Sequence, residues 1–182
     1  MTVRVLALSG SLRAASLNSM LLRAAARVAP AGVTLRLFTG LGHLPLFNPD
    51  LEAANPSAVA ALRRAIIEAD ALVIASPEYA HGVSSVIKNA LDWMVGNESF
   101  VYKPVALFNA SPRATIALDA LHETLRTMSA RIVDDACIAV PLLGSNLSEE
   151  QLVRDAGISA TLSRSLATLA GVAADRQTRE PL

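Results

Sequence analysis

The sequence contains very little cysteine and few histidines. Its 182 residues include one cysteine, Cys137, which cannot form an internal disulfide and has no second cysteine at metal-ligand spacing. The histidines, His43, His81 and His122, stand far apart and belong to no ligand motif. A disulfide scaffold is therefore excluded, a zinc site is not expected, and a reducing compartment, the cytoplasm, is the simplest location.

Net charge and long apolar runs are also absent. The 16 Lys and Arg residues balance 16 Asp and Glu residues, and no basic run concentrates positive charge locally. The sequence therefore lacks the concentrated positive charge that binding to nucleic acid or to an anionic membrane requires. No stretch approaches the roughly 20 apolar residues of a spanning helix, and the first apolar stretch reaches polar Ser9 too soon for a signal peptide. We expect no nucleic-acid partner and no membrane association.

Residues that build a core are abundant. Hydrophobic residues make up 52% and charged residues 18% of the sequence, and a charged fraction below about 25% is unlike that of a disordered chain. The length is typical of one domain. We expect a single domain over residues 1–174, followed by a polar tail over residues 175–182.

Short apolar runs alternate with segments of helical periodicity along this domain. The expected strands cover residues 3–8, 33–38, 71–76, 104–109 and 131–140, the last with a polar interruption at Asp134-Asp135. The expected helices cover residues 17–29, 56–69, 84–95, 117–128 and 148–174. Continuous apolar strands between helices indicate an α/β fold whose parallel sheet is covered on both faces, a doubly wound three-layer sandwich. A ligand of such a fold lies beyond the carboxyl ends of the strands.

The first loop at that edge, residues 9–18, joins a buried strand to a helix N-terminus and has the composition of an anion site. Free N–H groups and the helix dipole favour negative charge there, and the loop adds polar side chains at Ser9, Ser11, Arg13, Ser16 and Asn18. Neither G-x-G-x-x-G nor G-x-x-x-x-G-K is present, which favours a monophosphate held by hydroxyls and an arginine. The alternative is that Ser16 only caps the helix and the other serines fill a turn.

The loops over residues 76–83 and 110–116 would complete a pocket. Tyr79 offers a planar, partly apolar wall for an aromatic ligand, although ordinary packing is an equal alternative. Glu78 suits a hydrogen-bond acceptor or a base, and equally a solvated carboxylate or a helix cap. In the third loop, Ser111 could donate to a ring heteroatom, and Arg113 is either a contact for a second anionic ligand or a plain surface residue.

Three motifs together resemble one protein family. They are Gly10-Ser11-Leu12-Arg13-x-x-Ser16-x-Asn18, Pro77-Glu78-Tyr79 and Lys88-Asn89-Ala90-Leu91-Asp92-Trp93. Their order and spacing are similar to those of the NADPH-dependent FMN reductases, a flavodoxin-like group that includes bacterial quinone and chromate reductases. The resemblance implies a flavodoxin-like three-layer sandwich with a five-stranded parallel sheet in the order 2-1-3-4-5.

The resemblance also implies a cofactor and an activity. FMN would bind non-covalently at Ser9, Ser11, Leu12, Arg13, Ser16, Leu17, Asn18, Pro77, Glu78, Tyr79, Ala80 and Ser111. Hydride would pass from NADPH or NADH to the flavin and on to a small acceptor such as a quinone or free flavin, with no side chain acting as acid, base or nucleophile. A homodimer or homotetramer would form near the helix of the third motif, where Trp93 and Met94 are apolar.

Some residues depart from the pattern of the family. Ala80 stands where asparagine is common, Ser84 stands where proline is common, and residues 111–115 replace a glycine-rich loop. These departures bear on FMN affinity and on the choice of acceptor. The alternative function is that of a flavodoxin-like electron carrier without its own nicotinamide site, but carriers are usually strongly acidic, and the balanced charge argues against that role.

Overall fold

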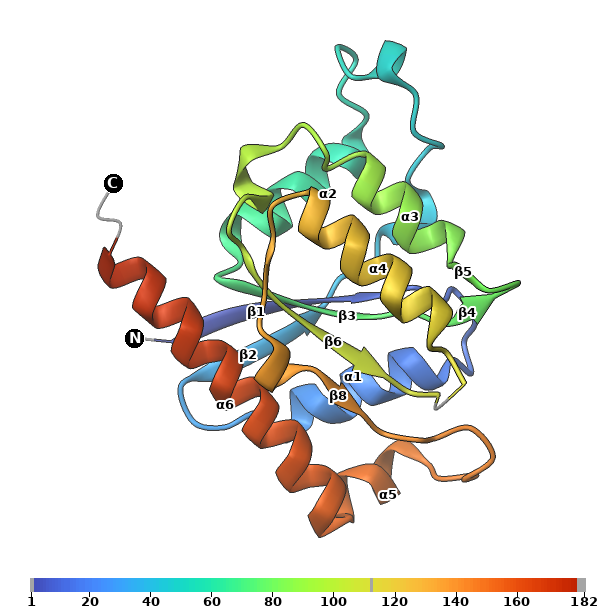
Figure 1. Cartoon of the computed structure of the whole chain (residues 1–182), viewed down its shortest axis with the longest axis vertical. Coiled ribbons are helices and arrows are strands. Elements are labelled where there is room, and N and C mark those ends of the chain that lie inside the picture. The colour runs from blue at the N-terminus through green and yellow to red at the C-terminus, as the bar shows by residue number, and fades with distance from the viewer. Residues whose placement is uncertain (1, 112, 180–182) are drawn as a thin grey trace.

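Strands and helices alternate along the chain, as the hydrophobic pattern predicts (Figure 1). The computed structural model describes residues 2–111 and 113–179, without the side chains of residues 176–179. The strands are β1 (Val3–Ser9), β2 (Val33–Leu37), β3 (Ala71–Ala75), β4 (Glu78–Tyr79), β5 (Gly82–Val83), β6 (Pro104–Asn109), β7 (Arg131–Ile132) and β8 (Ile138–Ala139). The α-helices are α1 (Leu17–Arg27), α2 (Ser57–Glu68), α3 (Ser85–Asp92), α4 (Ile116–Thr127), α5 (Glu149–Arg154) and α6 (Ala156–Arg179).

The central sheet is parallel and follows the order β2-β1-β3-β6-β7, which confirms the predicted order. Its middle strands are apolar on both faces: every residue of β3 and of β6 is buried. In the register, Val5 of β1 lies opposite Ala71 of β3, and Leu72 lies opposite Val105 of β6. The carboxyl ends of β1, β3 and β6 therefore meet at one edge of the sheet.

The fifth strand is not continuous, and its prediction as one strand over residues 131–140 was wrong. The polar pair Asp134-Asp135 forms a short 3-10 helix (Asp134–Ala136) that separates β7 from β8. Both short strands pair with β6, at its start and at its end. Between them, the backbone N–H of Leu107 donates to Sγ of Cys137 at 3.2 Å, so the thiol supplies the acceptor that the interrupted strand lacks.

This contact gives the single cysteine a structural role that can be measured. Cys137→Ala leaves the buried N–H of Leu107 without an acceptor, and we expect the free energy of unfolding to fall by about 1–2 kcal/mol. Cys137→Ser keeps an acceptor at the same position and should lose less. Urea denaturation of the three proteins checks this ranking, and equal losses for both variants would contradict it.

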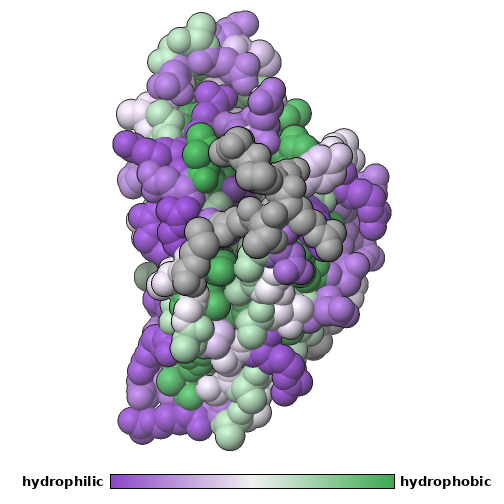
Figure 2. Space-filling view, turned by 90° about the vertical axis from the view of Figure 1, so that its left-hand side faces the viewer, coloured by the Kyte–Doolittle hydropathy of each residue, from purple (hydrophilic) through white to green (hydrophobic). Residues whose placement is uncertain are grey.

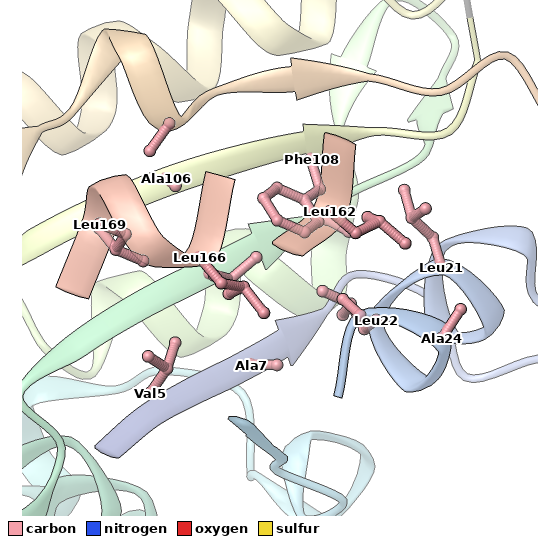
Figure 3. Close-up of a cluster of buried hydrophobic side chains, with 14 of the residues drawn as sticks. Val5, Ala7, Leu21, Leu22, Ala24, Ala106, Phe108, Leu162, Leu166 and Leu169 are labelled. Carbon is pink, nitrogen blue, oxygen red and sulfur yellow. The ribbon is translucent and has the colours of Figure 1, made fainter. Parts of the chain in front are cut away.

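Two helical layers cover the sheet. One hydrophobic cluster joins α1 and α6 to one face through β1, β3 and β6. Figure 3 shows this cluster, with Leu21 and Leu22 of α1 and Leu162 and Leu166 of α6 directed at the strands. A second cluster packs α2, α3 and α4 on the opposite face. The three-layer architecture is therefore as predicted.

The C-terminal part consists of two helices where one over residues 148–174 was expected. Ser148 and Gln151 form a capping box at the start of α5. Asp155 then leaves the helical conformation, and its Oδ1 accepts the N–H of Ile158 at 2.8 Å, which starts α6. Because α6 continues to Arg179, the expected end of the helix near residue 174 was wrong, and residues 180–182 of the expected tail lie outside the described part.

One of the two lysines is buried. The Nζ atom of Lys103 donates to the carbonyl oxygens of Ile66 at 3.0 Å and of Ala69 at 2.7 Å, at the C-terminal end of α2. A cation at this position satisfies end carbonyls and complements the helix dipole. Lys103 therefore fastens α2 to the start of β6.

The N-terminal ends of the strands lie at the end of the molecule shown in Figure 2. Hydrophilic residues dominate this view, and hydrophobic residues gather in smaller patches between them. Arg4 pairs there with Asp70 at 3.3 Å. In the part of the chain that the structure describes, no helix combines the length and the apolarity needed to cross a membrane.

Candidate functional site

A cleft of about 340 Å³ opens at the carboxyl ends of β1, β3 and β6, at the right-hand edge of the sheet in Figure 1. This volume falls within the range of about 300–1,000 Å³ that is usual for small-molecule sites. The lining residues are Ser11, Arg13, Ala15, Ser16, Leu17, Asn18, Ser76, Pro77, Glu78, Tyr79, Ala110, Ser111, Arg113, Ala114 and Leu143. All three loops singled out from the sequence contribute to it.

Three of the predicted FMN-binding residues do not line the cleft. Ser9 is buried beneath the first loop, where its Oγ lies 2.7 Å from Oγ of Ser19. Leu12 is exposed and faces Gly42 instead. Ala80 lies at an exposed turn. The other predicted residues, Ser11, Arg13, Ser16, Leu17, Asn18, Pro77, Glu78, Tyr79 and Ser111, are brought together.

The first loop presents the N-terminus of α1 to the cleft. Ser16 is the N-cap residue, and its Oγ accepts the N–H of Ser19 at 3.1 Å. The N–H groups of Leu17 and Asn18 precede the first intrahelical bond, because a helix offers no carbonyl to its first donors. Arg13 is exposed on the preceding loop. Ser16 thus caps the helix, which was the alternative to an anion-binding role. It also lines the cleft beside the N-terminus of α1, which attracts an anion.

Asn18 gives this end of the cleft an unusual feature. Its side chain is buried, and Oδ1 has no hydrogen-bond partner among the described residues. A buried polar atom without a partner costs free energy, and such groups commonly mark a ligand or water position. Rotation of the amide exchanges its oxygen and its NH2 group. The side chain can therefore donate to a phosphate, so the donor set at the α1 end fits that group.

The second loop folds into a hairpin that was not predicted. Residues Glu78 and Tyr79 of β4 pair antiparallel with Val83 and Gly82 of β5. The two turn residues, Ala80 and His81, both have positive φ, at 48° and 58°. A two-residue turn of this kind favours asparagine or glycine, and neither occurs at these positions, which is why sequence patterns gave no signal. The hairpin holds Tyr79 half-exposed at the edge of the cleft.

Glu78 caps a helix from a distance. One carboxylate oxygen accepts the N–H of Ala117 in the first turn of α4 at 2.9 Å, and the other lies 3.0 Å from Nδ1 of His81. Thr115, the N-cap residue of α4, makes no side-chain bond of its own. The N–H of Ala117 and then the His81 ring hold the pKa of Glu78 below its ordinary value, although partial burial opposes them. Of the roles considered for Glu78, the structure shows the helix cap.

This cap predicts a pH dependence. Because the pKa of Glu78 is lowered on folding, its carboxylate stabilises the folded state above the ordinary value of 4.5, and this contribution is lost as the pH falls through the lowered pKa. Glu78→Gln should therefore have a lower Tm than the wild type at neutral pH, and the difference should shrink between about pH 5 and pH 3. Thermal unfolding across this range checks it. A difference that stays constant with pH would contradict the charge-based cap.

Hydrogen bonds link the described residues of the third loop to Asn109 at the end of β6. Oδ1 of Asn109 accepts the N–H of Ser111 at 2.9 Å, and its Nδ2 donates to the carbonyl oxygen of Ala114 at 3.4 Å. Oγ of Ser111 accepts the N–H of Arg113 at 3.4 Å. Arg113 itself is exposed and lines the cleft. Pro112, one of the residues that replace the glycine-rich loop of the family, lies outside the described residues.

Gly10 of the first loop packs closely against Ser76 and Ser84, which flank the second loop. Ser84 caps α3 through the N–H of Ile87 at 3.3 Å, and its Oγ accepts a hydrogen bond from Oγ of Ser76 at 3.3 Å. A Cβ atom on Gly10 would lie only 2.7 Å from each of these hydroxyl oxygens. Ser84, which replaces a common proline, therefore starts the helix by capping it.

The third motif anchors a distant segment. Nδ2 of Asn89 and Nε1 of Trp93 both donate to the carbonyl oxygen of Pro45, at 3.0 and 2.9 Å. The Trp93 ring meets that of Phe47 edge to face, with centroids 5.1 Å apart. Trp93 and Met94 are each only 1% exposed. The two side chains therefore pack inside one chain, and their apolar character does not support a subunit contact near this helix.

Sequence reasoning missed several cleft residues. Ser76 and Ala110, the first residues of the second and third loops, line the cleft although they were not among the residues expected to bind FMN. Leu143 follows β8, and the rule that ligands lie beyond strand ends, applied to the fifth strand, would have included its loop. Ala15 and Ala114 carry no functional group that marks them.

Comparison with known proteins agrees with this geometry. Residues 3–142 match the family described as NADPH-dependent FMN reductase. An NAD(P)H-dependent FMN reductase of Pseudomonas aeruginosa is 40% identical over 112 residues, and a quinone reductase of Pseudomonas putida is 33% identical over 136 residues. The matched segments cover 60% of each chain in the first pair and 72% in the second. This chain thus spans about three fifths of the length of the first relative.

A solved structure extends the likeness over the whole fold. The chain is similar to FerB, a flavoenzyme NAD(P)H:(acceptor) oxidoreductase of Paracoccus denitrificans, with a TM-score of 0.84 and 26% identity over 96% of this chain and 98% of that one. The segment that matches the family contains β1 to β8 and the three loops of the cleft. The chain belongs to the NADPH-dependent FMN reductase family.

Proposed function

We propose that this chain is an NAD(P)H-dependent oxidoreductase that uses FMN to pass electrons to a small acceptor such as a quinone or free flavin. The observation that carries the proposal is the composition of the cleft. Its α1 end combines a cation, hydroxyls, helical N–H groups and an unsatisfied buried amide. The cleft is also lined by Pro77 and a half-exposed Tyr79, which suits a planar ring.

Each group of residues has a separate task in this proposal. Ser11, Arg13, Ser16 and Asn18 would hold the phosphate, and charge-assisted bonds to Arg13 would be the strongest of these contacts. Pro77, Tyr79 and Ser111 would border the ring. The bound flavin supplies the hydride chemistry, while the protein binds and orients it. Glu78 is occupied by Ala117 and His81, so it serves the shape of the site and is not assigned a proton transfer.

Titration with FMN, followed by quenching of flavin fluorescence with riboflavin run beside it, tests the cofactor site. Saturable binding of FMN that riboflavin does not match, followed by oxidation of NADPH without any partner protein, supports the proposal. FMN binding without NADPH or NADH oxidation would favour the electron-carrier alternative. If neither flavin binds, the proposal is wrong.

We also propose a homodimer, or a homotetramer built from it, in the cytoplasm. Leu46 is 83% exposed beside Pro45, which α3 holds, and Val95 just after α3 is 65% exposed. Apolar surface of this kind is suited to contact with a second copy. A sedimentation experiment at micromolar concentration that shows only a 19.1 kDa species would contradict the dimer.

A further inference from the structure

Two buried hydroxyls lie beneath the first loop. Ser9 is the last residue of β1, and Ser19 lies in the first turn of α1. Both residues are buried, their Oγ atoms lie 2.7 Å apart, and neither lines the cleft. The pair therefore ties the strand directly to the helix, and these two elements hold the two ends of the first loop.

The hydroxyl of Ser9 fixes the backbone of Ser11. The N–H of Ser11 donates to Oγ of Ser9 at 3.4 Å, and Oγ of Ser9 donates to the carbonyl oxygen of Ser11 at 3.5 Å. A hydroxyl has a single proton to donate, so the proton between the two serine hydroxyls has to come from Ser19. Only one direction thus satisfies all of these contacts: Ser19 donates to Ser9, and Ser9 donates to Ser11.

The hydroxyls of Ser11 and Ser16 both accept backbone N–H groups and line the cleft. Oγ of Ser11 accepts the N–H of Arg13 at 3.4 Å, and Oγ of Ser16 accepts the N–H of Ser19 at 3.1 Å. Each hydroxyl therefore uses a lone pair for the backbone and keeps its own proton. A phosphate offers acceptor oxygens, and two hydroxyls that already accept are suited to donate to it.

We propose that Ser19 is a positioning residue for the phosphate of FMN, because its hydroxyl, acting through Ser9, holds the Ser11 segment in the conformation that directs donors at the phosphate. This inference rests on the proposed function. Hydrogen bonds in a chain polarise one another, and a loop that is already ordered loses less freedom when its ligand binds. Ser19 does not touch the cofactor, so its effect depends on the phosphate and not on the flavin ring.

The experiment compares Ser19→Ala with the wild type by fluorescence titration with FMN and with riboflavin. Alanine is a good helix former, so α1 is retained. We expect the Kd for FMN to rise about three- to tenfold, the contribution of a single hydrogen bond, and the Kd for riboflavin to stay unchanged. Ser165→Ala is the matched control and should bind FMN like the wild type. Ser165 is a buried serine of α6 whose hydroxyl donates to the carbonyl oxygen of Ala136, and it does not line the cleft.

Two further measurements distinguish positioning from a general structural role. The phosphorus NMR resonance of bound FMN should shift in Ser19→Ala and not in Ser165→Ala, because only the first variant alters the donors around the phosphate. Ser9→Ala should lose affinity for FMN and not for riboflavin, and adding Ser19→Ala to it should cause no further loss, since Ser19 acts through Ser9. Additive losses, or an unchanged resonance in Ser19→Ala, would overturn the proposal.

The outcomes also separate this inference from the proposed function. Equal losses of FMN and riboflavin affinity in Ser19→Ala would show a general structural role and refute the inference, and an unchanged FMN affinity would refute it as well. In both cases, a wild type that prefers FMN to riboflavin leaves the proposed function intact. A wild type that binds FMN no more tightly than riboflavin would refute the phosphate site of the proposed function and this inference with it.

Discussion

Replacement of Arg13 by alanine should weaken FMN binding by about 1.5–3 kcal/mol, which is roughly a 10- to 150-fold rise in Kd. Arg13 lines the α1 end of the cleft and forms no ion pair with a described carboxylate. Its loss therefore removes a charged contact from the phosphate without freeing a buried partner. The remaining donors, Ser11, Ser16 and Asn18, are neutral and cannot compensate for it.

Fluorescence titration with FMN and riboflavin measures this effect. Riboflavin lacks the phosphate, so its weaker affinity should be the same in Arg13→Ala and in the wild type. Arg164→Ala removes an exposed arginine from α6, away from the cleft lining, and controls for the change in net charge. An unchanged FMN affinity in Arg13→Ala would refute the assignment of the phosphate to the first loop.

A second large effect is expected at Gly10, where alanine should lower the free energy of unfolding by about 3 kcal/mol, the upper part of the range for overpacking. The added Cβ would lie 2.7 Å from Oγ of both Ser76 and Ser84 and 2.9 Å from Cγ1 of Ile87. Ser84 is committed to capping α3, and Ile87 is fully buried. Neither Ser84 nor Ile87 can move without disturbing the helix or the core.

Chemical denaturation tests this expectation with two comparisons. Gly171→Ala in α6 adds the same methyl group where no atom lies within 4 Å, and it should be neutral or stabilising by up to about 1 kcal/mol. In a Ser76→Ala and Ser84→Ala background, Gly10→Ala should cost less, because the two hydroxyls are gone. If Gly10→Ala lowers the free energy of unfolding no more than Gly171→Ala does, the close packing of Gly10 against Ser76, Ser84 and Ile87 is wrong.

The elements that could be predicted are those with a strong and uninterrupted pattern. The apolar run of β6 ends at the predicted residues, Pro104 and Asn109, because it is buried on both faces. The β4 and β5 hairpin could not be predicted, since Ala80 and His81 adopt positive φ without the residue types that favour it. The break at Asp155 depends on one side-chain bond to a backbone N–H, which spacing alone does not reveal.

The three loops of the candidate site were predictable, and so were most of the side chains that line it, but the directions of some loop side chains were not. The three loops follow parallel strands, and the rule that a ligand lies beyond the carboxyl ends of such strands predicted that they would meet at one cleft. The direction of a loop side chain depends on local backbone geometry, which is why Leu12 turns to Gly42 and Ser9 lies beneath the loop. The partner of Glu78, the N–H of Ala117, is 39 residues away in the sequence, and no local pattern could connect them.

The contact between Cys137 and the N–H of Leu107 has a chemical consequence for a chain proposed to process quinones. Quinones are electrophiles that become attached covalently to thiolates, and the reaction depends on the fraction of sulfur that is ionised. Burial raises the pKa of the Cys137 thiol, and its sulfur is engaged with the sheet. As this is the only cysteine of the chain, the protein offers little nucleophilic sulfur to its own substrate, and we expect it to survive repeated turnover without arylation.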